Sequence, residues 1–106
     1  LFLEHHVSVC VSKISPFVEN RENARKILKN FGFVEIYIKC HIDLCEKRDV
    51  KGMYKKARND EIRNFIGVHI KYEPPISPDL IVDTENSTIN NNVQIILDYL
   101  KENKMI

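Results

Sequence analysis

At residues 48–58 the chain reads Arg-Asp-Val-Lys-Gly-Met-Tyr-Lys-Lys-Ala-Arg. Asn-Phe-Ile-Gly follows at residues 64–67, and Tyr-Glu-Pro-Pro follows at residues 72–75. A dense basic cluster therefore runs into an aromatic residue, a glycine and a stiff Pro-Pro turn. A segment that swings over phosphates needs a hinge and positive charge, and a flat aromatic face suits a ring. This order of residues predicts a mobile lid, about residues 48–75, over an anionic ligand that carries a ring.

The basic character of the lid is its strongest feature. Six positive charges fall within sixteen residues, and they belong to Arg48, Lys51, Lys55, Lys56, Arg58 and Arg63. A charge run of this kind is ordinarily a solvated helix face. Here the run opens with a glycine pivot, and few acidic residues stand between the basic ones. We therefore interpret the run as a phosphate-binding lid.

Length and composition narrow the range of functions. The 106 residues are enough for at most one small domain. Charged residues make up 29% and the net charge is +1, which argues against binding to bulk nucleic acid or to a membrane surface. No apolar run is long enough to span a bilayer, and no signal peptide is visible. Three cysteines without framework spacing favour a reducing compartment. We expect a cytoplasmic protein, and the first residue, Leu1, suggests a chain whose beginning has been lost.

Strand and helix patterns alternate along the chain. Runs of β-branched or apolar residues predict strands at 7–14, 33–40 and 80–82. Helical patterns are found at 20–30, 43–48, 54–65 and 89–100. The order β-α-β-α-α-β-α predicts an α/β fold with a parallel sheet, and the nearly continuous apolar character of 33–40 suits burial on both faces.

The first predicted helix, 20–30, has the clearest periodicity. Its expected buried face consists of Ala24, Ile27, Leu28 and Phe31. Asn20 is expected to cap its start, and Gly32 is expected to end it. Asp43 has the corresponding capping position in the helix at 43–48.

From end to end, the chain resembles the C-terminal portion of adenylylsulfate kinases. The resemblance rests on the lid sequence at 48–58, on Asn-Phe at 64–65, and on Ile-Ser-Pro-Phe at 14–17. It implies a P-loop nucleoside-type kinase fold with a parallel sheet, in which residues 1–106 are the C-terminal part of a single kinase domain. The fold is incomplete here, because the N-terminal strands and the glycine-rich phosphate loop have no counterpart in this sequence.

For the lid, the resemblance implies particular ligand contacts. Lys51, before the glycine, matches a lysine that contacts adenylylsulfate, and Arg48 matches an arginine that lies near the nucleotide. Asn64 and Phe65 match substrate-binding residues, the phenylalanine stacking on the adenine of adenylylsulfate. Two positions depart from the family, which usually has threonine and aspartate where this chain has Ile66 and His69.

At the end of the first predicted strand, Ile14 and Ser15 are implied to hold adenylylsulfate. The position suits a ligand, since open parallel sheets bind ligands beyond the carboxyl ends of their strands. Ser15 matches a serine that is phosphorylated in some members, but no neighbouring base is evident that would make it a nucleophile. We therefore interpret Ser15 as a binding residue and expect no catalytic residue and no metal ligand in this chain. Ser87 is implied to approach the adenine of ATP.

Four further residues have ordinary explanations. Arg21 and Arg25 match two spaced arginines that follow Ile-Ser-Pro-Phe in the family, and helix packing or a surface salt bridge explains them equally well. Cys40 and Cys45 have no redox or zinc spacing, and we expect them to be buried as small apolar groups.

The activity implied by the resemblance is transfer of the γ-phosphate of ATP to the 3′-hydroxyl of adenylylsulfate. The product is 3′-phosphoadenylyl sulfate, the activated sulfate donor of sulfate assimilation. ATP is implied with Mg²⁺, both bound mainly by the N-terminal region that this sequence lacks. Family members also form homodimers and occur fused to ATP sulfurylase. The alternative is a non-catalytic nucleotide- or partner-binding relative that has lost the phosphate loop.

A missing central strand has a physical consequence. In the resembled fold, the strand that carries the phosphate loop lies between the strands that match 7–14 and 33–40. Without that neighbour, both segments expose backbone edges and apolar faces. Such exposure costs more than the stability margin of a small domain, which is roughly 5–15 kcal/mol. We therefore expect the isolated chain to be inactive and poorly stable.

Overall fold

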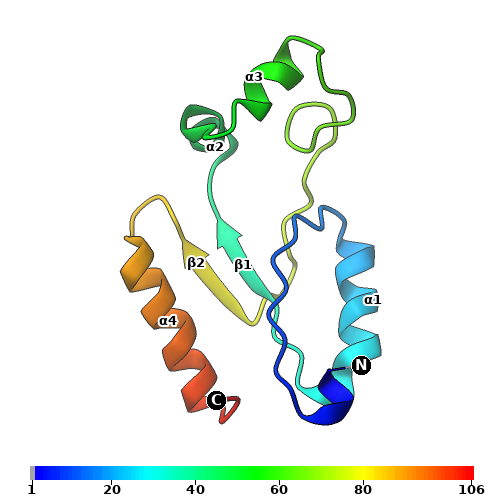
Figure 1. Cartoon of the computed structure of the whole chain (residues 1–106), viewed down its shortest axis with the longest axis vertical. Helices are drawn as coiled ribbons and strands as arrows, with labels where there is room; N and C mark the ends of the chain where they lie inside the picture. Colours follow the sequence, from blue (N-terminus) through cyan, green and yellow to red (C-terminus); the bar gives the residue numbers. More distant parts are fainter. Residues whose placement is uncertain (1) are drawn as a thin grey trace.

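Two short parallel strands form the only sheet among residues 2–106, which are the residues that the computed structural model describes (Figure 1). They are β1 (Ile36–Lys39) and β2 (Leu80–Asp83). The register pairs Ile38 with Val82, and Val82 is the largest side chain that is completely buried. Parallel neighbours require a long crossover, and the predicted lid lies within this crossover.

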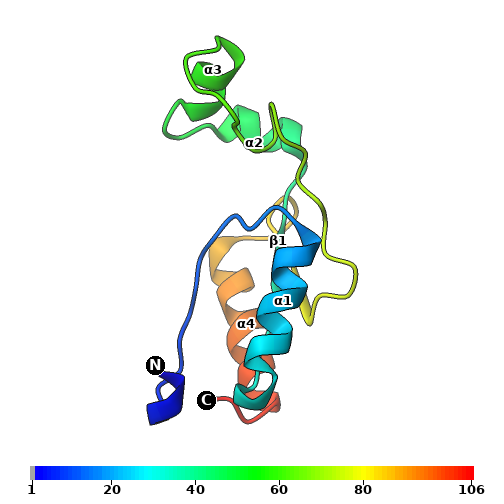
Figure 2. The ribbon, with the colours of Figure 1, turned by 90° about the vertical axis from the view of Figure 1, so that its right-hand side faces the viewer.

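The remaining regular elements are helical. In chain order they are the 3₁₀ turns and α-helices η1 (Leu3–His5), α1 (Val18–Leu28), η2 (Lys29–Phe31), α2 (Ile42–Arg48), α3 (Met53–Arg58) and α4 (Ile89–Glu102). In both ribbon views α2 and α3 lie at one end of the molecule, whereas α1, α4 and the two termini lie toward the other (Figures 1 and 2). α4 packs against β2. No helix within the described range is both long and apolar enough to cross a membrane.

The hydrophobic core is very small. Among the residues whose burial is described, which are 2 and 4–106, Ala57 and Val82 are the only buried hydrophobic residues, with 0% and 2% of their surface exposed. The accessible surface is 8561 Å², whereas a folded 12.4 kDa protein is expected to expose roughly 6,100 Å². The radius of gyration is 15.9 Å, compared with about 13 Å for a compact chain of this length. The molecule therefore presents much more surface to solvent than a closed domain of its size.

The predicted strand at 7–14 is wrong for this structure, because the segment forms no strand. A strand exists only where a second backbone completes its hydrogen bonds. β1 pairs with β2, and no other described segment pairs with β1. Val7, Val9 and Val11 consequently stay exposed. The expected open apolar surface is thus present at this segment.

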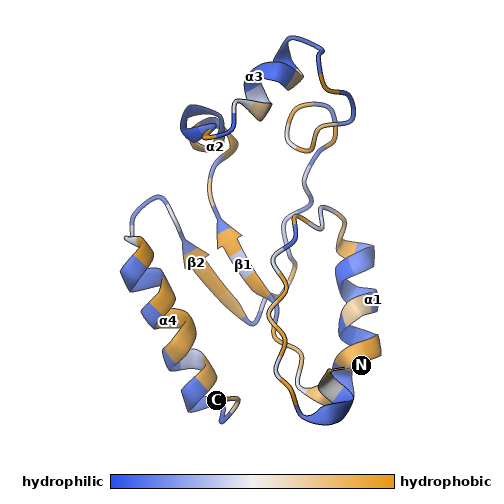
Figure 3. Ribbon diagram, viewed as in Figure 1, coloured by the Kyte–Doolittle hydropathy of each residue, from blue (hydrophilic) through white to orange (hydrophobic). Residues whose placement is uncertain are grey.

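The other two predicted strands are present, the first of them shortened. β1 covers only four residues of the predicted 33–40, and burial on both faces is wrong, since Ile38 is 55% exposed. β2 begins at the predicted Leu80 and extends to Asp83. Figure 3 shows both strands as largely hydrophobic. The apolar pattern identified the strands, but the described chain has no layer that covers both of their faces.

Helix α1 begins earlier than predicted and is not capped by Asn20. Phe17 occupies the N-cap position without a side-chain cap, and the first helical N–H, that of Val18, donates to the Glu73 carboxylate at 2.8 Å. Gly32 does end the helical segment, in a left-handed conformation with φ +76°. The predicted buried face is only partly covered, because Ile27 is 75% exposed and Phe31 is also exposed, whereas Ala24 and Leu28 are half-buried.

Helices α2 and α3 also differ from their predicted bounds. α3 ends at Arg58 rather than 65, since Asp60 takes a left-handed φ of +59° and the residues that follow have few apolar groups to anchor a helix. α2 is capped by His41, whose Nδ1 accepts the Asp43 N–H at 3.2 Å, and not by Asp43. α4 matches its predicted start and ends two residues later than predicted, at Glu102.

Candidate functional site

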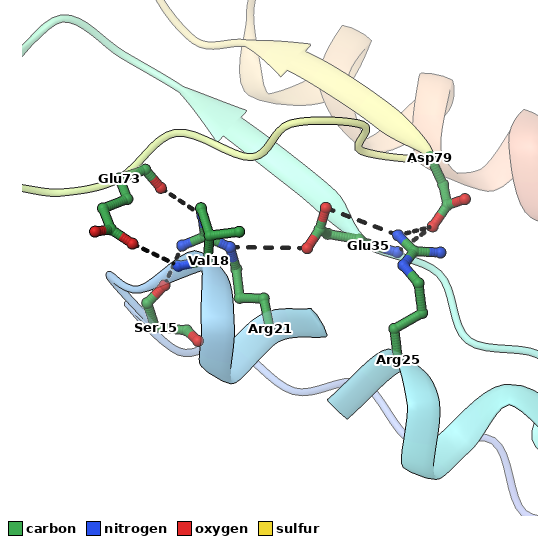
Figure 4. A network of polar contacts seen from close by, with 7 residues as sticks. All are labelled: Ser15, Val18, Arg21, Arg25, Glu35, Glu73 and Asp79. Carbon is green, nitrogen blue, oxygen red and sulfur yellow. Dashed lines mark hydrogen bonds and ion pairs between the residues drawn. The ribbon is translucent and has the colours of Figure 1, made fainter. Parts of the chain in front are cut away.

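The Ser-Pro loop, residues 14–17, lies directly before α1 and is held by a side chain of that helix. Arg21 Nη1 donates to the carbonyl oxygen of Ser15 at 2.5 Å, and Nη2 donates to the carbonyl oxygen of Glu73 (Figure 4). The Glu73 N–H in turn donates to the carbonyl oxygen of Pro16 at 2.8 Å. The loop is therefore tied to the Tyr-Glu-Pro-Pro segment that ends the lid, more than fifty residues away in sequence.

Two acidic residues complete this polar network. Glu35 is buried, and its carboxylate lies 3.8 Å from Arg21 Nε and 3.7 Å from Arg25 Nη2. Asp79 pairs with Arg25 at 3.1 Å and accepts the Glu35 N–H at 2.7 Å. The hydrogen bond to Asp79 is the main reason why the pKa of Arg25 is raised above its ordinary value. Of the two explanations left open for these arginines, ion pairing holds for both, and Arg21 adds the backbone contacts.

An open hollow of about 530 Å³ lies at the carboxyl ends of both strands. Its lining includes Arg48 and Lys51 from the hinge of the lid and Thr84 from the end of β2. Arg48 donates to the carbonyl oxygen of Thr84 at 2.9 Å and approaches its hydroxyl at 3.4 Å. Lys51 is exposed. Two residues that the sequence singled out thus face the same space at the place where parallel sheets bind ligands.

The hinge of the lid has its own local order. Gly52 adopts a left-handed φ of +67° directly before α3. Asp49 accepts the N–H groups of Tyr54 at 3.0 Å and Lys55 at 3.1 Å, so a carboxylate of the basic stretch caps the lid helix. Arg58 at the other end of α3 pairs with Glu46 of α2. At least this cation of the basic run is therefore paired with an acidic side chain of the neighbouring helix.

Phe65 lies in a tight turn beyond α3. Its ring stands edge-on to Tyr54, with centroids 4.9 Å apart and planes at 76°, and Tyr54 lines the hollow. The Phe65 N–H donates to His69 Nδ1 at 3.0 Å, and its carbonyl accepts the His69 N–H at 2.8 Å. The histidine that departs from the family pattern therefore closes the turn that carries the aromatic ring.

The remaining predicted residues lie apart from the hollow. Ile14 is exposed, Asn64 is exposed with φ +56°, and Ser87 is half-buried; none of the three belongs to its lining. Ser87 follows a turn in which Asp83 accepts the Glu85 N–H at 2.8 Å and the Asn86 side chain at 3.0 Å. The structure thus gathers Arg48 and Lys51 at one place and ties Ser15 to the end of the lid.

The described residues of the site include no activated thiol and no cluster of metal ligands. Burial raises the pKa of the Cys45 thiol and of the Tyr54 hydroxyl, so neither is activated toward its anion. The expected burial of Cys40 and Cys45 as small apolar groups is only partial, since both are half-buried at the hollow. Residues 2–106 contain no group of three His, Cys, Asp or Glu side chains placed to hold a metal ion.

Sequence reasoning missed the residues that act from a distance. Glu73 and Asp79 hold α1 and its arginines from across the fold, and no local pattern marks such partners. The adjacent prolines after Glu73 were the available signal, because a stiff turn fixes the backbone that Arg21 binds.

Several known proteins have similar sequences. A family model for adenylylsulphate kinase matches residues 1–83. The adenylyl-sulfate kinase of Oceanobacillus iheyensis is 50% identical over 93 residues, which are 88% of this chain and 47% of that protein. The adenylyl-sulfate kinase of Clostridium acetobutylicum is 48% identical over 106 residues, which are 100% of this chain and 52% of that protein.

A solved structure shares the fold. The structure of the Mycobacterium tuberculosis APS kinase CysC in complex with AMPPNP and APS matches with a TM-score of 0.79 and 37% identity, over 84% of this chain and 52% of that chain. The two strands and their helices are therefore part of a P-loop kinase fold. With the family match over most of its length, the chain belongs to the adenylylsulphate kinase family. It spans about half the length of the curated relatives that it matches.

Proposed function

We propose that the protein is an adenylyl-sulfate kinase, and that residues 1–106 form the C-terminal part of its single kinase domain. In the reaction, the 3′-hydroxyl oxygen of adenylylsulfate bonds to the γ-phosphorus of ATP, and the bond from that phosphorus to the β-phosphate oxygen breaks. The hydroxyl proton is lost, and the products are ADP and 3′-phosphoadenylyl sulfate. This transfer depends mainly on positioning and on compensation of negative charge.

The contact between the Ser-Pro loop and the end of the lid carries the proposal. The resemblance assigns adenylylsulfate to the Ser-Pro loop and to Lys51, Asn64 and Phe65 of the lid, although the two segments are far apart in sequence. The hydrogen bonds from Arg21 to Ser15 and Glu73 tie that loop to the end of the lid. This tie supports a single ligand held by both segments.

The residue assignments follow the same division. For adenylylsulfate we propose backbone contacts from Ile14 and Ser15, charge from Lys51, and ring contacts from Asn64 and Phe65. The edge-on packing of Phe65 on Tyr54 supports the last of these, because it fixes the plane of the ring.

For ATP we propose Arg48 and, at the adenine, Ser87. Arg48 lines the hollow at the strand ends, where its charge can face phosphates. Magnesium is implied by the family, but the described residues do not fit a magnesium site, since they offer no cluster of three ligands. No step of the reaction is therefore assigned to the ion on this chain.

The cellular setting is also a proposal. Three free cysteines fit a reducing, cytoplasmic location. A homodimer and an association with ATP sulfurylase rest on the family resemblance alone.

The alternative is a non-catalytic nucleotide- or partner-binding relative. The 106 residues contain only three glycines, at 32, 52 and 67, and therefore no glycine-rich phosphate loop of their own, which agrees with either reading. For the same reason we propose that the chain alone does not turn over substrate.

A chimera tests the proposal. The part of the Clostridium acetobutylicum relative that precedes its match is fused before residue 1, and ADP release is measured with ATP, with and without adenylylsulfate. We expect turnover that depends on adenylylsulfate in the chimera and none in the chain alone. Phe65→Ala should raise the KM for adenylylsulfate, whereas the control Ile76→Ala, at an exposed site away from the fusion point, should not. A folded chimera without turnover that depends on adenylylsulfate would favour the non-catalytic alternative.

A further inference from the structure

Arg21 is a buried cation with contacts in three different segments. It is 9% exposed, and its guanidinium reaches the carbonyl oxygens of Ser15 and Glu73 and lies 3.8 Å from the Glu35 carboxylate. It also lies 5.4 Å above the ring of Tyr72, which precedes Glu73 in the lid. A planar guanidinium can donate in several fixed directions at once, which the point charge of a lysine cannot reproduce.

We call the contact of residues 14–18 and Arg21 with Glu73 the junction. Hydrogen-bond donors lie on both sides of it. Glu73 receives a hydrogen bond from Arg21, donates its N–H to Pro16 at 2.8 Å, and accepts the Val18 N–H on its carboxylate at 2.8 Å. One lid residue thus binds the Ser-Pro loop at Pro16, the first residue of α1 and Arg21; its contacts with Val18 and Arg21 are drawn in Figure 4. Ser15 has a φ of +38°, a conformation that a non-glycine residue keeps only where its surroundings hold it.

Arg25, one helical turn further along α1, provides the contrast. It lies above the ring of Phe33 and pairs with Asp79 and Glu35. It shares the helix, the charge and one acidic partner with Arg21, but the structure gives it no hydrogen bond to the Ser-Pro loop or to Glu73. The two arginines therefore separate the stabilising effect of an ion pair from the effect of the junction.

We infer that Arg21 is a positioning residue that fastens the Ser-Pro loop to the return end of the lid, so that adenylylsulfate meets both in one fixed arrangement. The inference rests on the proposed function, since it concerns how that substrate is held. Arg21 does not touch the reacting atoms in this role; it sets the backbone carbonyls and N–H groups of its neighbours. Arg48 and Thr84, which line the part of the hollow that we propose for ATP, are not among the contacts of Arg21.

Kinetics of Arg21→Lys and Arg25→Lys in the chimera give the first test. Arg21→Lys should raise the KM for adenylylsulfate about tenfold, as expected for the loss of a charge-assisted hydrogen bond, and should leave the KM for ATP nearly unchanged. Arg25→Lys should lower the melting temperature and leave the ratio of the two KM values as it is. Equal increases of both KM values in Arg21→Lys, or a lower melting temperature with unchanged KM values, would overturn the inference.

Hydrogen exchange in the chimera gives a second test that needs no activity. The N–H groups of Val18 and Glu73 both donate across the junction, so both should exchange faster in Arg21→Lys than in Arg25→Lys, with the amides of α4 as internal reference. Unchanged exchange at these two amides would refute the junction even if the chimera is active. If the unmutated chimera shows no turnover while the two amides respond as expected, the proposed function fails and the fastening by Arg21 stands.

Discussion

Around Arg21, buried polar groups are matched with one another, whereas at the edge of β1 and along residues 7–14 apolar groups remain uncovered. The junction is built from groups that all belong to this chain, so it can keep its geometry without further help. The sheet edge lacks its partner, because hydrogen bonds and apolar faces of a strand are completed only by neighbouring layers. Two parts of one molecule thus differ in whether their interactions are complete.

The largest effect should come from completing the open edge. In the chimera with the Clostridium acetobutylicum segment, we expect cooperative urea unfolding with a stability of roughly 5–15 kcal/mol, whereas the chain alone should unfold broadly and bind the dye ANS. Val11→Asp sharpens the test: it should have little effect in the chain alone, where Val11 is exposed, and a large one in the chimera. A chain that unfolds cooperatively by itself without binding ANS would show that its edge is not deficient.

A smaller effect should come from breaking the matched polar region. Glu35 is buried between two guanidinium groups, so Glu35→Gln in the chimera should lower the free energy of unfolding by about 3 kcal/mol, as for the loss of one partner of a buried ion pair. The measurement is urea denaturation, and Arg21→Lys combined with Glu35→Gln should be less than additive. A loss below about 0.5 kcal/mol, the range of an ordinary surface change, would mean that the network adds little.

The next test concerns the lid. A Cβ on Gly67 would come within 2.7 Å of Ile42 Cδ1, at a φ of +94°. Gly67→Ala should therefore displace the turn that carries Phe65 and raise the KM for adenylylsulfate, with a local cost of roughly 1–3 kcal/mol for the strained backbone. Gly52→Ala is the matched control, since its φ is +67° but a Cβ there meets no atom within 4 Å. Equal effects of the two substitutions would assign the cost to backbone strain alone.

The smallest effect should be a pH effect at the turn after β2. The pKa of Asp83 is lowered, first by the hydrogen bond from the Asn86 side chain and then by the Glu85 N–H. A carboxyl whose folded pKa is lowered contributes stability above its unfolded pKa and loses that contribution as the pH falls through the folded value. Asn86→Ala should return the pKa of Asp83 toward its ordinary range, which carboxyl carbon NMR measures. An unchanged titration would leave the backbone N–H groups of Glu85 and Asn86 and the charge of Lys39 as the causes of the lowered pKa.

The sequence indicated the strands and helices whose partners lie nearby. Leu80–Asp83 and the helix from Ile89 were predictable, because α4 lies next to β2 and both patterns agree with their local setting. The segment 7–14 has an equally good strand pattern and forms no strand, since a pattern states what a segment would do beside a partner. The β propensity of residues 7–14 therefore indicated that the segment can form a strand, but it could not indicate whether a neighbouring strand is present to pair with it.

The site divides in a similar way. Arg48 and Lys51 could be predicted together, because side chains three residues apart at a hinge share one place. The fastening by Arg21 could not, because its partners at Ser15 and Glu73 are backbone carbonyls, which every residue possesses. The cap of α1 by Glu73 was hidden for a different reason: the carboxylate lies fifty-five positions from Val18.

The position of the lid inside the crossover between β1 and β2 has a kinetic consequence. The two strands are neighbours in the sheet, but residues 40–79 separate them, so their ladder closes a loop that carries a substantial entropy cost. Local helices form quickly, whereas contacts between distant residues form late. During synthesis the lid leaves the ribosome before β2 exists, and its return end has no strand to follow. The lid is therefore synthesised before the strand that completes its crossover.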